Sequence, residues 1–150
     1  CAVLIHERGM KNVVVTNGNI CSNYFEALFP LIDAMNIDLK AFNESFYEAV
    51  SGDFKTVKAN IRLAAEHCHV EITTLVIPGE NDSDEEMDAL AEWLAGINPE
   101  IPLHVSRFFP CYQMLDRGAT EIETVCRLAE IARNHLEYVH TRNNSAPKLC

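Results

Sequence analysis

The hydrophobic pattern of the chain switches repeatedly between a period of about 2 residues and a period of about 3.6 residues. The shorter period is typical of strands and the longer one of amphipathic helices, so we expect strands and helices to alternate. Strands that alternate with helices form βαβ units, and such units build a parallel sheet. The pattern therefore predicts an α/β domain.

The predicted elements follow from β-branched or alternating segments, helical apolar stripes, and turn residues between them. We expect strands at 13–15, 35–40, 70–77 and 103–109 and a last extended piece at 138–141. Helical stripes lie at 25–32, 54–65, 87–94 and 122–132. Capping-box spacing predicts helix starts at Ser45, Ser83 and Thr120. Residues 2–5 look like the end of a helix, so we expect the domain to be truncated at its N-terminus.

The chain is acidic, because 22 Asp and Glu residues oppose 12 Lys and Arg residues and give a net charge of −10. Phosphate backbones repel such a chain, so we expect no nucleic-acid partner. Its apolar runs are too short to cross a membrane. No signal peptide opens it, and its six cysteines are too widely spaced for a secreted disulfide scaffold. We therefore expect a cytoplasmic protein with no membrane partner.

The segment 35–40 alternates apolar and polar residues and is the most informative part of the sequence. Its polar residues, Asn36, Asp38 and Lys40, would share one face, because side chains alternate along a strand. Parallel strands are usually apolar on both faces. An amide, a carboxylate and an ammonium on one covered face need a polar ligand or a mutual ion pair. An edge strand with one solvent-exposed face is the alternative interpretation.

The other predicted strands carry polar residues in equivalent places. Thr16 and Asn17 close the first strand at a Gly turn, and Thr73 and Ser106 lie on polar faces of two later strands. Ligands of parallel α/β folds bind at the C-terminal ends of the strands. The predicted cofactor-binding residues are Thr16, Asn17, Asn36, Asp38, Lys40, Thr73 and Ser106. The sequence identifies no catalytic residue.

Two polar clusters favour structural roles over metal binding. His67, Cys68 and His69 are consecutive, so their side chains diverge. The acidic run 81–86 lacks the central Gly and the last Glu of an EF-hand, and helix capping explains it. No CxxC, CxxxC or HExxH spacing occurs, so we predict no metal site in this chain.

Four motifs in this order resemble the radical S-adenosylmethionine (SAM) superfamily. They are TNG at 16–18, MNIDLK at 35–40, LVIPGEND at 75–82, and HVSRFFP at 104–110 followed by Tyr112, Met114, Asp116 and Arg117. The first three resemble the glycyl-radical-activating branch, whose best-known member is pyruvate formate-lyase activating enzyme. The fourth is similar to the AmmeMemoRadiSam-system radical SAM proteins.

The resemblance implies that residues 1–143 form the C-terminal part of a partial (β/α) barrel of the TIM type. About four parallel strands and a terminal strand would remain, followed by a polar tail at 144–150. It also implies a radical SAM oxidoreductase that cleaves SAM reductively at a 4Fe–4S cluster to give a 5′-deoxyadenosyl radical. Asp38 and Lys40 would contact the ribose and methionine moieties of SAM, and Thr16 would help to hold the methionine end.

The sequence departs from the family pattern in several places. Thr73 and Tyr112 stand where activating enzymes often have an arginine and a histidine. The cluster motif CxxxCxxC and a Gly-Gly-Glu segment are absent. We therefore expect SAM and the cluster to belong to a full-length parent and no cofactor to bind this chain alone. The chain is then either a fragment or a degenerate relative that has lost catalysis.

Other functions and partners stay open on the sequence alone. Lys40 could form a Schiff base in a lyase on a TIM-type barrel, although a neighbouring Asp38 opposes the free amine. A non-catalytic binding module is the other alternative. The substrate could be a glycyl-radical protein or a small molecule. An exposed edge near 12–16 predicts self-association.

Overall fold

Five parallel strands form a single sheet in the computed structural model, which describes residues 1–142. They lie side by side in chain order and are β1 (Val13–Thr16), β2 (Ala34–Asp38), β3 (His69–Val76), β4 (Leu103–Arg107) and β5 (Val139–Arg142). This sheet confirms the predicted parallel α/β architecture with four strands and a terminal strand. The predicted tail at 144–150 lies outside the described residues.

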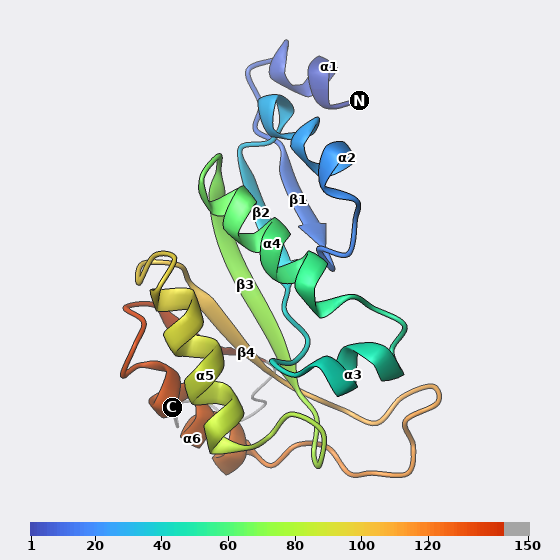
Figure 1. The fold of residues 1–150 in the computed structure, drawn as a ribbon, viewed down its shortest axis with the longest axis vertical. Coiled ribbons are helices and arrows are strands. Elements are labelled where there is room, and N and C mark those ends of the chain that lie inside the picture. Colours follow the sequence, from blue (N-terminus) through green and yellow to red (C-terminus); the bar gives the residue numbers. More distant parts are fainter. Residues whose placement is uncertain (143–150) are drawn as a thin grey trace.

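Helices connect the strands and cover one face of the sheet. They are α1 (Ala2–His6), α2 (Ser22–Glu26), the 3-10 helix η1 (Phe29–Leu31), α3 (Glu44–Ala49), α4 (Phe54–Ala65), α5 (Asp84–Ala95) and α6 (Ile122–Ala132). Figure 1 shows α4 and α5 in front of the strands, and α6 packs beside α5 against β4 and β5. Each connection therefore brings the chain back to start the next strand beside and parallel to the previous one, as in a (β/α) barrel.

Burial alternates along β2 and β3, as a side-chain period of two requires, whereas the first four residues of β4 are all buried. Met35 and Ile37 on β2 point into the helix layer, where Val70 and Ile72 on β3 lie beside them in register. Burial of each such side chain contributes about 1.5–3 kcal/mol, so the contact between sheet and helices dominates the stability of the fold. The other face of the sheet is called the inner face below.

A helix begins within two residues of each predicted start, but two of the three predicted capping residues are wrong. Asn43, rather than Ser45, caps α3, and its Oδ1 accepts a hydrogen bond from Phe46 N at 2.7 Å. Thr120 caps no helix; its hydroxyl instead donates to the carbonyl of Val76 at 2.6 Å. Ser83 caps α5 as predicted. Capping spacing identifies a helix start only where no tertiary partner competes for the hydroxyl.

Candidate functional site

The strand register brings most of the predicted polar residues to the inner face. Asp38 on β2 pairs with Thr73 on β3, and Thr73 pairs with His104 on β4. Paired residues of parallel strands point to the same side. The polar or charged residues of the inner face are Asn36, Asp38, His69, Glu71, Thr73, His104, Ser106, His140 and Arg142.

Side-chain hydrogen bonds tie neighbouring strands together across this face. The Thr73 hydroxyl donates to Asn36 Oδ1 at 2.9 Å, and His104 Nε2 lies 2.6 Å from Glu71 Oε2. Both contacts run diagonally, from one strand to a residue one level nearer the N-terminal end of the preceding strand. The inner face is therefore an ordered polar surface.

Asp38 and Lys40 form an ion pair at the end of β2. Lys40 Nζ donates to Asp38 Oδ2 at 2.7 Å, and the side chains are 39% and 26% exposed, respectively. The second oxygen of Asp38 forms no hydrogen bond within residues 1–142. The pair thus keeps both a carboxylate acceptor and ammonium donors for a ligand.

The backbone of Lys40 is held from two directions. Its amide donates to the hydroxyl of Tyr47 at 3.0 Å, and its carbonyl accepts from Asn81 Nδ2 at 2.6 Å. Burial raises the pKa of Tyr47 to about 12, so its hydroxyl stays protonated at neutral pH. Asn81 is buried, and the sequence analysis did not include it among the site residues. A buried Asn needs hydrogen-bond partners, so the burial of Asn81 beside two strand ends is the feature that identifies it, and the sequence does not show that burial.

Thr16 does not share the inner face with the other predicted strand residues. It pairs with Ile37, so its side chain points into the helix layer, where its Oγ1 accepts from Gly18 N at 3.1 Å. Gly18 has a φ of +68°, and a Cβ there would lie 3.0 Å from Ile37 Cγ2. Asn17 is exposed, and its Oδ1 accepts from Asn19 N. The turn is primarily structural.

A cavity of about 560 Å³ opens where β1, β2 and β3 end. Its polar lining residues include Asn17, Asn19, Lys40 and Glu80. Leu75 and Met114 contribute apolar surface. Of the predicted site residues, Asn17 and Lys40 line this cavity. Asn36, Asp38, Thr73 and Ser106 lie on the inner face outside its lining. The position agrees with ligand binding at C-terminal strand ends.

A charged network that the sequence analysis missed lies across β3, β4 and β5. Arg142 Nε donates to His104 Nδ1 at 3.0 Å, so the other ring nitrogen carries the proton and donates to Glu71. Burial lowers the pKa of His104, with the Arg142 charge as a further cause. The hydrogen bond from His104 lowers the pKa of Glu71. A neutral imidazole therefore bridges a cation and an anion.

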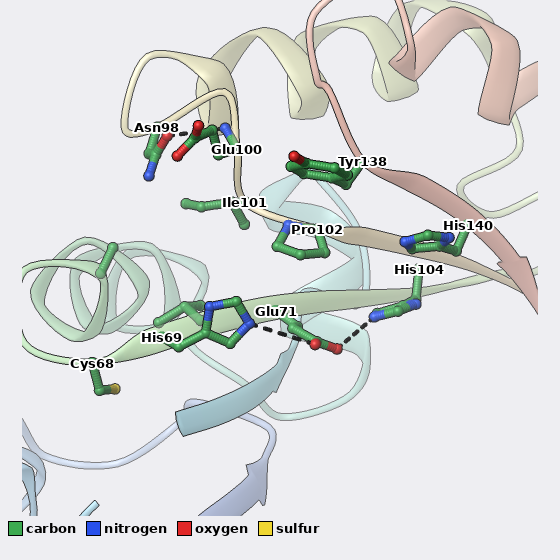
Figure 2. A pocket seen from close by; sticks show the side chains of 12 residues that line it. Cys68, His69, Glu71, Asn98, Glu100, Ile101, Pro102, His104, Tyr138 and His140 are labelled. Atoms are coloured by element: carbon green, nitrogen blue, oxygen red, sulfur yellow. Dashed lines mark hydrogen bonds and ion pairs between the residues drawn. The ribbon is translucent and has the colours of Figure 1, made fainter. Parts of the chain in front are cut away.

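A second cavity, of about 460 Å³, lies at the other end of the strands, where β3, β4 and β5 begin (Figure 2). His69 and Glu71 line one side of it, and Glu100 and Tyr138 lie across from them. The ring of His140 stacks on His104 with centroids 5.3 Å apart. This end of a parallel α/β barrel serves stability rather than ligand binding, so the first cavity is the better candidate site.

The described residues do not fit an iron–sulfur cluster. Cys1, Cys21, Cys68 and Cys111 have free thiols, but no three His, Cys, Asp or Glu side chains within residues 1–142 are grouped to hold a metal ion. Such a cluster requires three or four thiolates in one place.

Within residues 1–142, no helix has both the length and the apolar character to cross a membrane.

Comparison with known proteins places these observations in a family. The model of the radical SAM superfamily matches residues 2–93. An uncharacterized protein of Methanocaldococcus jannaschii, MJ0808, is 36% identical over 95% of this chain. The match covers 43% of that relative, so the chain spans less than half of its length.

Solved structures show the same fold. A domain of pyruvate-formate lyase-activating enzyme from Bacteroides vulgatus has a TM-score of 0.78 and 18% identity, over 93% of this chain and 86% of its own. A radical SAM methyltransferase from Sphaerobacter thermophilus has a TM-score of 0.73 and 20% identity, over 92% and 43%. TYW1 with a lysine-pyruvate adduct bound has a TM-score of 0.65 and 18% identity, over 92% and 45%.

These likenesses and the parallel sheet with its helix layer describe one architecture, a partial radical SAM (β/α) barrel. The family match covers more than half of the chain and includes β1, β2, β3 and most of α5. The chain therefore belongs to the radical SAM superfamily of enzymes.

Proposed function

We propose that the inner face near the ends of β2 and β3 binds SAM, and that this chain is the SAM- and substrate-binding part of a radical SAM oxidoreductase. The observation that carries the proposal is the Asp38–Lys40 ion pair, which sits at the C-terminal end of β2 beside a cavity. Ordered charges of both signs at that position match the zwitterionic methionine moiety of SAM and its ribose hydroxyls.

Each residue has a role that its free hydrogen-bonding groups permit. The unpaired oxygen of Asp38 would accept from a ribose hydroxyl, and Lys40 would donate to the SAM carboxylate. Thr73 and Asn36 bond to each other and form a fixed polar floor beneath. Asn17 would contribute an amide at the mouth of the cavity. A role for Thr16 in SAM binding stays a prediction, and it would be the turn after Thr16, rather than its side chain, that lies near the ligand.

The cluster chemistry is not assigned to this chain. In the family, reductive cleavage of SAM is the chemistry that a 4Fe–4S cluster would supply. The described residues do not fit that cluster, so the proposal for this chain is limited to binding and orienting SAM and substrate. The activating-enzyme fold likeness supports a glycyl-radical protein as substrate, and a small molecule is the alternative.

A Schiff-base lyase is the second candidate function. TYW1, a solved structure with a similar fold, has a lysine-pyruvate adduct bound. A Schiff base requires a free amine, however, whereas the Lys40 ammonium donates to Asp38 at 2.7 Å. The ion pair therefore favours SAM binding over Schiff-base chemistry for Lys40. Without a segment that holds the cluster, the chain would be a binding module without catalysis.

The test replaces each member of the ion pair and measures SAM affinity by calorimetry. The polypeptide for this test joins the chain to a CxxxCxxC segment, so that 5′-deoxyadenosine formation is a second measurement. Asp38→Ala and Lys40→Ala should each weaken SAM binding about ten- to hundred-fold, the value of one charge-assisted hydrogen bond. Lys55→Ala is the matched control, because Lys55 forms an exposed ion pair with Glu44 on the helix side. Unchanged SAM affinity in both site variants would overturn the proposal.

A further inference from the structure

We propose that Arg142 and Ser106 form a subsite for an anionic group of the substrate, a carboxylate or a phosphate. The inference rests on the proposed function, because it assigns the β2–β3 side of the inner face to SAM and the β4–β5 side to the substrate. It also reassigns Ser106 from the predicted SAM set to the substrate. The juxtaposition that carries it is a guanidinium held on a neutral imidazole, with an unpaired serine hydroxyl at its register position on the neighbouring strand.

Arg142 is held in place by the residue beneath it. Its Nε donates to His104 Nδ1 at 3.0 Å, and its Nη2 lies 3.3 Å from His104 Nε2. The ring is itself fixed, because it is buried and donates to Glu71 (Figure 2). The His140 ring stacks against it. A guanidinium positioned in this way has lost part of its freedom before a ligand arrives, which favours binding.

No contact neutralises the charge of Arg142 within residues 1–142. Its described partner is a neutral ring, and no carboxylate of that part of the chain forms an ion pair with it. By contrast, Arg117, Arg127 and Arg133 each pair with a carboxylate. A guanidinium stays protonated at any pH at which the protein is folded. Arg142 therefore offers a positive charge at the end of β5.

Hydrogen-bond donors remain free beside this charge. The guanidinium has five N–H groups, and the contact with His104 occupies only its Nε and Nη2 side. Ser106 is the register partner of Arg142 on the same face, and it is buried. Its hydroxyl forms no hydrogen bond within the described part of the chain. Among the described residues, Ser106 Oγ is not one of the fully buried unpaired atoms, so it reaches solvent and is available to donate to a ligand.

The distribution of charge explains why the anion belongs on the β4–β5 side. The protein carries a net charge of −10, so an anionic group needs a local cation. On the β2–β3 side, the proposed function assigns the remaining donors of Lys40 to the SAM carboxylate. At the end of β4 and β5, Arg142 supplies the charge and Ser106 a further donor. Guanidinium forks bind carboxylate and phosphate groups through paired hydrogen bonds.

The experiment titrates the protein with inorganic phosphate and with malonate, while the side-chain Nε–H resonance of Arg142 is followed by NMR. Sodium chloride at matched ionic strength is the reference. Both probes, or one of them, should shift this resonance with saturation, and the active probe identifies phosphate or carboxylate as the group. Calorimetry should show affinity for that probe reduced at least about tenfold in Arg142→Met, with smaller losses in Arg142→Lys and Ser106→Ala. Arg62→Met is the matched control, because Arg62 is exposed on α4 and lies over Trp93.

Two results would overturn the inference. One is a wild-type titration indistinguishable from chloride. The other is equal probe affinity in the wild-type protein and in Arg142→Met, Arg142→Lys and Ser106→Ala. The variant Asp38→Asn distinguishes the anion subsite from the SAM proposal. This variant should bind SAM more weakly and should keep the wild-type affinity for phosphate or malonate. Failure of one proposal is thus visible without failure of the other.

Discussion

The side chain of Asn81 is hydrogen-bonded to the backbone of Lys40, so the loop after β3 holds the loop after β2. Asn81 Nδ2 donates to the Lys40 carbonyl at 2.6 Å and to the Leu75 carbonyl at 2.9 Å. Its Oδ1 accepts from Ile77 N at 2.7 Å. One buried amide thus uses both donors and an acceptor to fix the two strand ends that frame the candidate site.

The first prediction concerns this amide. Asn81→Ala should lower the free energy of unfolding by about 2–4 kcal/mol, because it leaves buried backbone groups without partners. It should also weaken SAM binding, because Lys40 loses its backbone support. Urea unfolding and calorimetric SAM titration measure the two effects. Asn134→Ala is the control: Asn134 is exposed after α6 and its side chain forms no hydrogen bond within residues 1–142, so its removal should change stability by less than about 0.5 kcal/mol. Equal stability of both variants would contradict this assignment.

The second prediction separates binding from stability at the ion pair. Asp38 and Lys40 are partly exposed, and pairs of this kind contribute about 0–1 kcal/mol. Lys40→Ala should therefore leave urea unfolding almost unchanged while it weakens SAM binding. A loss of stability greater than about 2 kcal/mol would instead identify the pair as a structural element of the fold.

The third prediction is a loss of stability in acid that depends on His104. Burial lowers the pKa of His104 in the folded state, so protonation favours the unfolded chain. Its contribution is complete above about pH 6.5, the ordinary histidine value, and falls as the pH drops below it. The pKa of Glu71 is also lowered, so its contribution is lost at still lower pH. Arg142, His140 and His69 are the other titratable or charged neighbours.

Urea unfolding between pH 8 and pH 5 tests this pH dependence. The wild-type protein should lose stability over this range more steeply than His104→Gln, whose side chain does not titrate. The difference between the two slopes isolates His104 from the remaining histidines. Parallel curves would show that the imidazole is protonated as easily in the folded state as in the unfolded chain.

The fourth prediction concerns Gly18. Its φ of +68° strains any residue with a Cβ, and the added atom would also lie 3.0 Å from Ile37 and 3.4 Å from Val57. Gly18→Ala should therefore destabilise the protein by about 1–3 kcal/mol. Gly79→Ala has a similar positive φ but open space, so it should cost less. Thermal unfolding of the two variants compares backbone strain with backbone strain plus a steric clash.

The alternation of β2 made its faces predictable from the sequence. Asn36 and Asp38 share the polar face, as predicted, because apolar residues alternate with them and are buried. The same argument could not be made for Thr16. Val13, Val14 and Val15 are all apolar, so the sequence of β1 does not show which of its residues face the helices. Only the pairing with β2 shows on which face Thr16 lies.

The network of Glu71, His104 and Arg142 depends on contacts between strands that are far apart in the sequence. Glu71 and His104 are 33 residues apart, and His104 and Arg142 are 38 residues apart. Local periodicity assigns each to a face but does not give the order of strands. The parallel order β3-β4-β5 brings the three together. The resemblance to a family predicted the barrel, whereas the strand register in the structure was needed to locate this network.

The last prediction concerns the free edge of the sheet at β1. Within residues 1–142, β1 pairs only with β2, and Val13 and Val15 are 65% and 76% exposed on the inner face. An apolar strand with an unpaired edge is a template for another strand, so we propose that the chain self-associates through it. Val15→Lys should raise the dissociation constant measured by analytical ultracentrifugation, because a charge on the edge strand opposes pairing. Val3→Lys adds the same charge at a half-exposed valine on α1 and should leave it unchanged. Equal dissociation constants for the two variants would place the contact away from β1.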